Sequence, residues 1–532
     1  MKMEAKFNLL YEPWIRVLDK SGAVKETSLL DTLRNAHSFI QLAGELPTQD
    51  VAVLRLLLAV LYSVFTEYDS SGREVSLFDS DELDRWEELW ELGQFPCEII
   101  EKHLKQYEDR FYLFHPQTPF YQTADLSERK ATEYPAAKLI GDLSESSNKL
   151  RLFSYRNGER KRSLTYSEAA RWLLYLNGFD DTSAKPSVRG ENMPSTGAGY
   201  LGKLGLVYAA GDNLFETLML NFVLNQEDAD GKAVWEDAVH SEERRRIPQP
   251  ASRKELLTLQ SRRLLLIEGN DDKSVTGYKL LGGDFFDAEN AFVEHMTIWR
   301  KDKAGRLDNY KPKRHDPAKT LWRDFTSLTA TEGDLNSKRP GVVDWIALLT
   351  MENILQGKQI WLRMASVKYG DKDFFVDDVF GDSVSVNSSL LSKMGKEWIT
   401  RICDVLKDTE TCVWHLKNFA RAIDEALGGS NDRKKKRSLV EQAVSQAYFD
   451  MDIPFRRWLA GITPANDDVD EKMNEWLLQV RSQLLKQGRQ MLEGAGEKAW
   501  IGTKNGFTAL SLFENCVIKS TGGRRHGNEG TK

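Results

Sequence analysis

The stretch VDEKMNEWLLQVRSQLLKQGRQM, residues 469–491, decides the fold of the C-terminal part of the chain. Its large apolar residues recur at intervals of three and four, the spacing of one face of an α-helix. They are Val469, Met473, Trp476, Val480, Leu484 and Met491. Charged and amide side chains fill most of the other positions, so the stretch predicts an amphipathic helix that buries one face.

The same spacing continues on both sides of this helix. It is seen in residues 398–406, 413–427, 439–451 and 510–517. Breaks at Gly428-Gly429, Pro464 and Gly494–Gly496 separate the segments. Amphipathic helices with short connections predict an antiparallel bundle, to which we assign residues 391–518. A Gly- and charge-rich tail, residues 519–532, is predicted to be flexible.

Residues 1–390 show a mixed pattern instead. Alternating or continuous apolar runs predict strands in 8–30, 263–267, 275–281 and 291–299. Helical spacing or capping signals predict helices in 48–65, 81–93, 98–109, 167–176 and 214–224. The predicted fold class is therefore α+β: a large mixed N-terminal globular domain followed by a C-terminal antiparallel helical bundle of the four-helix type.

The amino-acid composition excludes several classes of protein. The chain has 532 residues, 41% of them hydrophobic, which excludes a disordered or low-complexity protein. Its four cysteines form no CxxC pair, so neither a zinc finger nor a disulfide framework is expected. Residues 1–8 hold no apolar run, and the run Val51–Phe65 is short for a membrane span and contains Arg55. We expect a cytoplasmic protein with no membrane partner.

The sequence contains no P-loop, GxSxG or HExxH motif, which are motifs of nucleotide-binding and catalytic sites. Asp377, Asp378 and Asp382 follow an aromatic pair, and two-metal nucleases use such carboxylates. Turn chemistry explains an Asp-rich segment equally well. We therefore predict no catalytic residue, metal or cofactor, and keep a metal-dependent nuclease as an alternative.

Two other features point to binding. A long loop, residues 180–213, is rich in glycine, and glycines permit the close approach of another backbone, either protein or nucleic acid. The net charge is −7, yet cations cluster locally, with aromatic residues beside some clusters. The clusters are residues 156–162, 241–263, 299–314 and 433–437. Such patches favour phosphate contacts or are solvated loops, so the residues alone leave a scaffold and a nucleic-acid binder open.

Two motifs give a more specific indication. The opening FNLLYEPWIRV, residues 7–17, resembles the start of the CasA family, the large subunit of the type I-E CRISPR Cascade complex. FHP at 114–116 followed by PFYQT at 119–123 resembles a later loop of that family. The order of the segments, the length and the terminal bundle extend the resemblance over essentially the whole chain.

The resemblance implies a non-enzymatic subunit of an RNA-guided antiviral complex. It would recognise a protospacer-adjacent motif in double-stranded DNA, help to open the duplex and recruit a helicase–nuclease, while guide pairing reads the longer sequence. The implied partners are the guide RNA, the target DNA and the other Cascade subunits: the backbone, small and 5′-handle-binding subunits. An assembly scaffold without DNA readout remains the main alternative.

The resemblance also implies site residues. For motif and DNA binding they are Gly197, Ala198, Gly199, Lys203, Lys279, Gly370, Asp371 and Lys372. For contact with the guide RNA they are Phe153, Ser154, Tyr155, Arg156 and Asn157. The wedge turn of the family falls at residues 368–372, where no Gln or Asn stands. Asp271–Lys273 replaces the cysteine cluster of some members, so no zinc is expected.

Outer-face cations of the predicted bundle complete the set. We predict that Lys472, Arg481, Lys486 and Arg489 follow phosphates of the displaced DNA strand.

Overall fold

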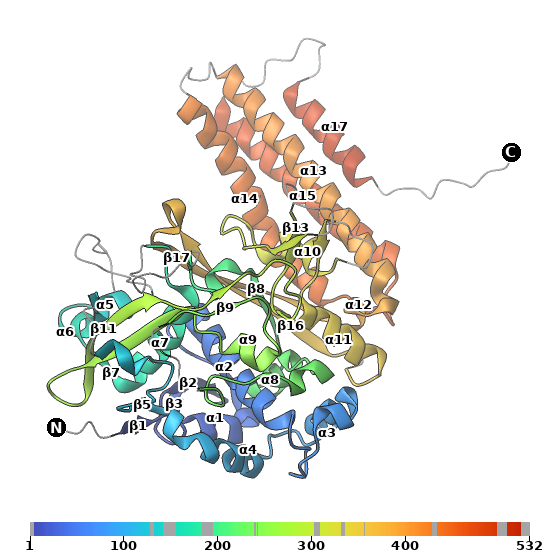
Figure 1. Cartoon of the computed structure of the whole chain (residues 1–532). Helices are drawn as coiled ribbons and strands as arrows, with labels where there is room; N and C mark the ends of the chain where they lie inside the picture. The colour runs from blue at the N-terminus through green and yellow to red at the C-terminus, as the bar shows by residue number, and fades with distance from the viewer. Residues whose placement is uncertain are drawn as a thin grey trace. The chain divides into compact units, whose positions relative to one another are not determined.

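The structure is a computed structural model, and it divides into two compact units (Figure 1). It describes residues 5–127, 132–141, 156–183, 195–238, 241, 243–302, 309–330, 336–355, 357–427, 433–496 and 508–522, with the side chains of 433–438 left out. Unit 1 comprises Met1–Lys319, Ala330–Trp345 and Trp361–Ser383. Unit 2 comprises Thr320–Thr329, Ile346–Ile360 and Val384–Lys532.

Unit 1 contains helices and several small sheets. Its main helices are α1 (Leu29–Arg34), α2 (Pro47–Phe65), α3 (Glu82–Glu91), α4 (Cys97–Leu104), α7 (Tyr166–Phe179), α8 (Leu214–Asn221) and α9 (Arg253–Leu257). Short helices are α5 (Ala136–Leu139) and α6 (Glu159–Arg162), and α11 (Gly341–Met351) continues into unit 2. The mixed α+β class predicted for this region is confirmed.

The strands within the described residues form six separate sheets. The strands are β1 (Lys6–Asn8), β2 (Ile15–Asp19), β3 (Val24–Thr27), β4 (Phe39–Leu42), β5 (Tyr112–Phe114), β6 (Glu133–Pro135), β7 (Leu164–Thr165), β8 (Leu206–Ala210), β9 (Arg246–Ile247), β10 (Arg262–Glu268), β11 (Ser274–Gly282), β12 (Phe285–Phe286), β13 (Trp299–Lys301), β14 (Tyr310–Pro312), β15 (Ser337–Lys338), β16 (Gln359–Tyr369) and β17 (Val376–Asn387). The orders are β1-β5, β3-β2-β4, β10-β11-β6, β12-β9, β14-β13-β15 and β17-β16-β8, with β7 also pairing with β11.

Helix α2 is the centre of unit 1. It is long and apolar enough to cross a membrane, but nearly all of its side chains are buried among other elements, including α7 and α9. Arg55 in the middle of α2 is buried and pairs with buried Glu294 at 2.9 Å. Tyr200 donates a hydrogen bond to the same carboxylate. Arg55 is thus a core residue whose charge is paired. Through Glu294 and Tyr200, its guanidinium connects α2 to the glycine-rich region.

Local sequence explains the elements that border the site. Thr165 and Glu168 form a capping box at the start of α7, which fixes where that helix begins. Strands β10 and β11 pair antiparallel, with Arg262 opposite Gly282. The structure corrects one predicted strand, because residues 291–298 form turns and only β13 begins at Trp299. Strand β8 lies inside the segment 180–213, which the sequence analysis treated as loop.

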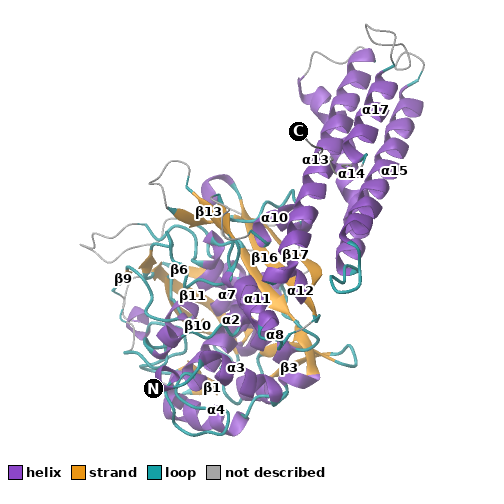
Figure 2. Cartoon of the chain, turned by 90° about the vertical axis from the view of Figure 1, so that its right-hand side faces the viewer, coloured by secondary structure: helices purple, strands orange, loops and turns teal. Residues whose placement is uncertain are grey.

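Unit 2 holds the C-terminal bundle, which Figures 1 and 2 show as long helices lying side by side. The described helices are α13 (Lys396–Ala426), α14 (Arg433–Ala460), α15 (Val469–Ala495) and α17 (Ala509–Thr521). The predicted break at Pro464 separates α14 from α15, whereas the one at Gly428-Gly429 lies outside the described residues. The predicted helical bundle is confirmed. The short helices α10 (Phe325–Leu328) and α12 (Ser388–Leu391) also belong to this unit.

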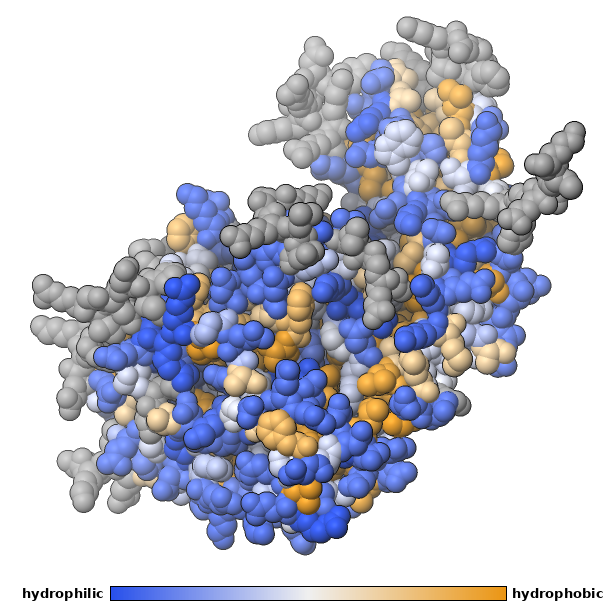
Figure 3. Space-filling model, turned by 45° about the vertical axis from the view of Figure 1, so that its right-hand side comes forward, coloured by the Kyte–Doolittle hydropathy of each residue, from blue (hydrophilic) through white to orange (hydrophobic). Residues whose placement is uncertain are grey.

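Aromatic residues fill the bundle core. Trp476 is buried and donates its indole N–H to Thr409 at 3.0 Å. Phe455 packs edge-on against Trp476, with ring centroids 5.0 Å apart. Trp322, far earlier in the chain, stacks on Phe455 at 4.6 Å and donates to Asp452 at 2.8 Å. Most hydrophobic residues are internal in this way, and the face drawn in Figure 3 is mainly hydrophilic with small apolar groups.

Candidate nucleic-acid interface

The glycine loop, residues 195–205, is fastened to the C-terminal end of α7. The Gly199 N–H donates to the carbonyl oxygen of Asp180 at 2.8 Å. Arg262, fully buried on β10, binds the Asp180 carboxylate at 2.6 Å and donates to the Gly197 carbonyl oxygen at 2.8 Å. A buried guanidinium with several acceptors holds its neighbours in one geometry, because a lost bond would leave a charge without a partner.

The glycines of this loop have different roles. A Cβ added at Gly199 would lie 2.4 Å from the carbonyl oxygen of Gly178, and one at Gly202 would lie 1.9 Å from the Tyr369 hydroxyl. A Cβ at Gly205 would lie 1.9 Å from the carbonyl oxygen of Lys313. These three glycines permit protein packing, which is one of the two alternatives that the sequence left open.

Gly197 differs from them. It has a φ of +63°, and a Cβ there would meet nothing nearer than the Lys203 side chain at 3.8 Å. Gly197 is half-buried, whereas Ala198 beside it is 2% exposed. Among the predicted motif-reading residues of the loop, the backbone of Gly197 is therefore the part open to approach by another molecule.

Lys203 supplies a cation beside Gly197. Its ammonium has no hydrogen-bond or ion-pair partner among the described residues and its side chain is half-buried. Burial, together with the nearby cations Arg262 and Arg314, lowers the pKa of Lys203 to about 8, against a smaller opposing effect of Asp287. A half-buried ammonium without a counter-ion is suited to an anionic ligand.

The turn 370–375, which contains the last three residues of the predicted wedge turn 368–372, lies against the same end of α7. Thr182 donates its N–H to the Asp373 carbonyl oxygen at 2.9 Å and its hydroxyl to the Lys372 carbonyl oxygen at 2.8 Å. Lys372 and Asp373 have φ values of 51° and 59°, which are unusual for residues other than glycine. The side chains of Asp371 and Lys372 are exposed.

Gly370 and Tyr369 join this turn to the body of unit 1. A Cβ at Gly370 would lie 2.1 Å from the Phe375 ring, so this glycine is needed for packing of the turn on itself. The Tyr369 hydroxyl donates to the Phe179 carbonyl oxygen at 2.8 Å. Arg314 lies over the Tyr369 ring at 5.3 Å and pairs with Asp373 at 2.8 Å. The structure thus brings two predicted DNA-contacting segments together.

Lys279 has a different environment. Its ammonium donates to the carbonyl oxygens of Leu126 and Ser127, both at 3.1 Å, and lies 4.0 Å from Glu133. Only 15% of its side chain is exposed. Lys279 therefore binds protein in this structure, and a contact with DNA would require it to exchange these carbonyls for a base or a phosphate.

The predicted guide-contacting residues are divided. Phe153, Ser154 and Tyr155 lie outside the described residues. Arg156 is buried and its guanidinium binds the carboxylates of Glu45 and Glu168. Asn157 is exposed at the start of the turn before α6. In this state Arg156 anchors its segment to the protein, because its charge is already paired.

The four predicted displaced-strand residues on α15 also differ. Lys472 lies near Asp467 and Glu475, and Arg481 donates to Thr521 on α17. Arg489 pairs with Glu514 on α17 at 2.9 Å. Lys486 is exposed with no partner among the described residues. Lys486 is thus the cation of this set best disposed for a phosphate.

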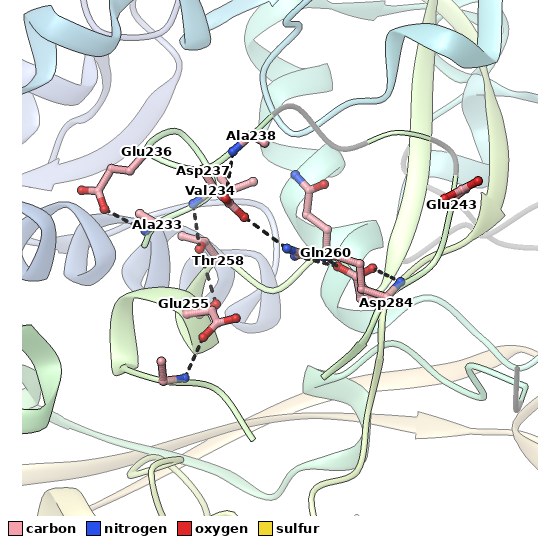
Figure 4. Close-up of polar contacts among 12 residues, drawn as sticks. Ala233, Val234, Glu236, Asp237, Ala238, Glu243, Glu255, Thr258, Gln260 and Asp284 are labelled. Atoms are coloured by element: carbon pink, nitrogen blue, oxygen red, sulfur yellow. Dashed lines mark hydrogen bonds and ion pairs between the residues drawn. The ribbon is translucent and has the colours of Figure 1, made fainter. Parts of the chain in front are cut away.

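Several residues of the basic patch 241–263 form ion pairs within the protein. Arg263 is buried and binds Asp284 at 2.5 Å. Arg245 binds Asp284 and Asp237, two carboxylates labelled in Figure 4. The sequence alone predicts a charged patch here, whereas these arginines have a structural role. The apolar run that follows Arg262-Arg263 was the signal that could have indicated burial.

The acidic residues of β17 do not form a metal site. Asp377 pairs with Lys368 at 2.6 Å, and Asp378 and Asp382 accept backbone N–H bonds from the residues that follow them. Within the described ranges, no group of three or more His, Cys, Asp or Glu residues could hold a metal ion. All three residues lie within strand β17, so the Asp-rich turn expected from the sequence is wrong, and their carboxylates bind Lys368 and neighbouring backbone N–H groups.

The described chain combines an α+β unit, in which a glycine loop lies beside a strained turn, with a helical bundle, as the resemblance to the CasA-type large subunits implies. The chain belongs to the CRISPR-associated Cse1 family, whose model matches residues 8–487. The resemblance to the CasA family of type I-E Cascade large subunits is therefore confirmed. Over 508 residues the chain is 28% identical to CasA/Cse1 of Thermus thermophilus, covering 94% of this chain and 92% of that protein.

Solved structures agree with this assignment. The crystal structure of Thermobifida fusca Cse1 is 28% identical with a TM-score of 0.84, covering 97% of this chain and 98% of that one. A chain of a structure described as a CRISPR RNA-guided surveillance complex is 17% identical with a TM-score of 0.73. It covers 98% of this chain and 100% of its own, and at that identity the likeness concerns the fold.

Proposed function

We propose that this chain is the large subunit of an RNA-guided surveillance complex that recognises a short motif in duplex DNA. It helps to open the duplex beside the motif and recruits a helicase–nuclease, with no catalytic step of its own. Its partners are the guide RNA, the target DNA and the backbone, small and 5′-handle-binding subunits. Membership of the Cse1 family and the fold shared with a chain of a surveillance complex support this proposal.

The observation on which the DNA-reading role rests is the open backbone of Gly197 beside the unpartnered Lys203 and near the turn 370–375. A backbone without a side chain can approach the floor of a minor groove, and a neighbouring cation can bind a phosphate or a base edge. Minor-groove readout separates mainly A·T from G·C pairs. We therefore expect several related motifs to be tolerated.

In this proposal the remaining predicted residues bind the other nucleic acids. Phe153 to Asn157 face the guide RNA, with Arg156 holding the segment in place through Glu45 and Glu168. Lys486 follows the displaced strand, and Lys472, Arg481 and Arg489 contribute after exchanging their present partners. Lys279 joins the motif site only if its ammonium leaves the carbonyls of Leu126 and Ser127.

A scaffold without DNA readout is the second candidate, because Gly199, Gly202 and Gly205 pack against protein. Binding of the guide-loaded complex to two duplexes distinguishes the candidates. One duplex has the correct motif and the other a scrambled motif, at one stated salt concentration. A reader prefers the correct motif and loses this preference when Lys203 and Lys372 are neutralised. If the chain is only a scaffold, these substitutions leave the ratio of the affinities for the two duplexes unchanged.

A further inference from the structure

The last residues of α7 and those that follow it, 178–183, contact both segments of the proposed motif site. We name this segment the α7 anchor. On the side of the glycine loop, Asp180 accepts the Gly199 N–H and binds the buried Arg262. On the side of the turn, Thr182 binds the carbonyl oxygens of Lys372 and Asp373. Two segments more than 160 residues apart in sequence are thus fastened to six consecutive residues.

A second connection runs in parallel through Tyr369. Its hydroxyl donates to Phe179 of the α7 anchor, and the same oxygen lies where a side chain at Gly202 would have to be. Arg314 covers the Tyr369 ring and binds Asp373 in the turn. Loop and turn therefore have a direct contact through Tyr369 and an indirect one through the α7 anchor.

The turn stores backbone strain at the point where the α7 anchor holds it. Lys372 and Asp373 both have positive φ, a conformation that residues other than glycine rarely adopt. Such conformations persist where the surroundings impose them, and they are common at functional sites. The Thr182 hydroxyl binds the Lys372 carbonyl oxygen and its backbone N–H binds that of Asp373, so Thr182 is well placed to maintain their conformation.

The base of this arrangement is rigid. Helix α7 begins with a capping box, and most of its residues are buried. A Cβ at Gly199 would lie 2.4 Å from the Gly178 carbonyl oxygen, and a Cβ at Gly178 would lie 2.6 Å from the Leu201 side chain, so neither glycine could carry a side chain without a shift. A displacement of the glycine loop on binding therefore reaches the turn through the α7 anchor, because close packing transmits strain.

We propose that Thr182 is a positioning residue that couples motif reading by the glycine loop to duplex opening by the turn 370–375. The inference rests on the proposed function, since it assigns reading to the loop and opening to the turn. The hydroxyl of Thr182 keeps the Lys372–Asp373 backbone in its strained conformation, so that engagement of Gly197 by DNA presents Lys372 to the first base pair.

The test compares Thr182→Val with Thr182→Ser in the guide-loaded complex. Valine keeps the β-branch and nearly the same volume but lacks the hydroxyl, whereas serine keeps the hydroxyl. Thr400→Val is the matched control, because the Thr400 hydroxyl donates to Lys396 on an exposed helix in the same way. Tyr369→Phe removes the second connection and serves as an independent variant.

Two DNA duplexes distinguish an effect on motif recognition from an effect on duplex opening. Both have the correct motif, and 2-aminopurine at the first adjacent pair reports unstacking by its fluorescence. The second duplex has mismatches at the first three pairs and is already open. We expect Thr182→Val to open the matched duplex about fivefold less, the effect of one lost hydrogen bond. It should bind the open duplex within twofold of wild type, and Thr182→Ser should behave as wild type.

The outcomes are distinguishable. If Thr182→Val opens the matched duplex as well as wild type does, the coupling is wrong even though motif reading stands. If it loses the same factor on both duplexes, or if Thr400→Val shows the same loss, Thr182 is merely structural and the inference is also wrong. If wild type itself shows no preference for the correct over a scrambled motif, the proposed function fails before any variant is compared.

Discussion

Substitution of Gly197 by Asn and by Asp is the sharpest test of the motif site. Asn and Asp are the side chains that best tolerate a positive φ, so the φ of +63° costs at most about 1 kcal/mol. The added Cβ meets only the Lys203 Cε, at the ordinary contact distance of 3.8 Å. Both variants should therefore fold with melting temperatures within a few degrees of wild type.

Their effects on DNA binding should differ in a defined way. Either side chain occupies the space that the backbone would share with the groove floor, so both should lose the preference for the correct motif. Aspartate adds a negative charge. At about 6 Å from a phosphate and an effective dielectric of about 60, this charge costs about 1 kcal/mol, or about fivefold in affinity. That extra loss should be the same for every sequence.

The assay is fluorescence anisotropy with correct-motif and scrambled-motif duplexes and the guide-loaded complex, at low and at physiological salt. The loss specific to Asp should shrink at higher salt, because exposed charges are screened. If Gly197→Asn folds normally and keeps the wild-type motif ratio, then Gly197 does not read DNA and its glycine serves only the loop conformation.

Gly199→Ala is the matched control in the same loop. Its Cβ would lie 2.4 Å from the Gly178 carbonyl oxygen, so α7 or the loop must shift. Overpacking of this kind costs about 1–3 kcal/mol. We expect a clear fall in melting temperature, whereas Gly197→Asn should cause little. Equal stability losses in the two variants would contradict the assignment of one glycine to packing and the other to the surface.

Three further predictions follow from charges. Because the pKa of Lys203 is lowered to about 8, duplex affinity should fall about fivefold between pH 7 and pH 9 in wild type, whereas Lys203→Arg should show no such fall in the same titration. Lys486→Gln should reduce the salt dependence of target binding by about one unit with unchanged stability, while Arg489→Gln should also lower the melting temperature through loss of the pair with Glu514. Burial raises the pKa of Asp50 to about 7, so the folded protein keeps a proton that the unfolded chain releases near pH 4. In denaturant titrations, the unfolding free energy of wild type minus that of Asp50→Asn should therefore fall by more than about 1 kcal/mol from pH 5 to pH 7.5. The same pH dependence of the unfolding free energy in both proteins would contradict this.

Periodicity was sufficient to predict the bundle. Its helices are long, and Trp476 and its neighbours recur at helical spacing over several turns, which leaves little ambiguity. Short elements were harder. Residues 291–298 are apolar enough for a strand but form turns, and β8 was hidden within a glycine-rich segment. Strand formation depends on a partner strand, and a single sequence does not show which segments pair.

The candidate site shows the same limit. Sequence could place cations near residues 241–263 but not distinguish Arg262, which is fully buried, from arginines at the surface. Burial of a charge depends on whether a distant carboxylate such as Asp180 reaches it, and these two residues are 82 positions apart. Likewise, Thr182 belongs to no motif, and only the folded chain reveals that Tyr369 binds the α7 anchor, of which Thr182 is a part.

The path of the chain between the two units has a practical consequence for fragments. Unit 2 includes Thr320–Thr329 and Ile346–Ile360 as well as everything from Val384 onward. A fragment that starts at residue 391 would omit Trp322, which stacks on Phe455 and donates to Asp452. Such a truncation would leave an apolar face of α14 open to solvent and prone to self-association. No single cut separates the units, so proteolysis or recombination at one site would damage both.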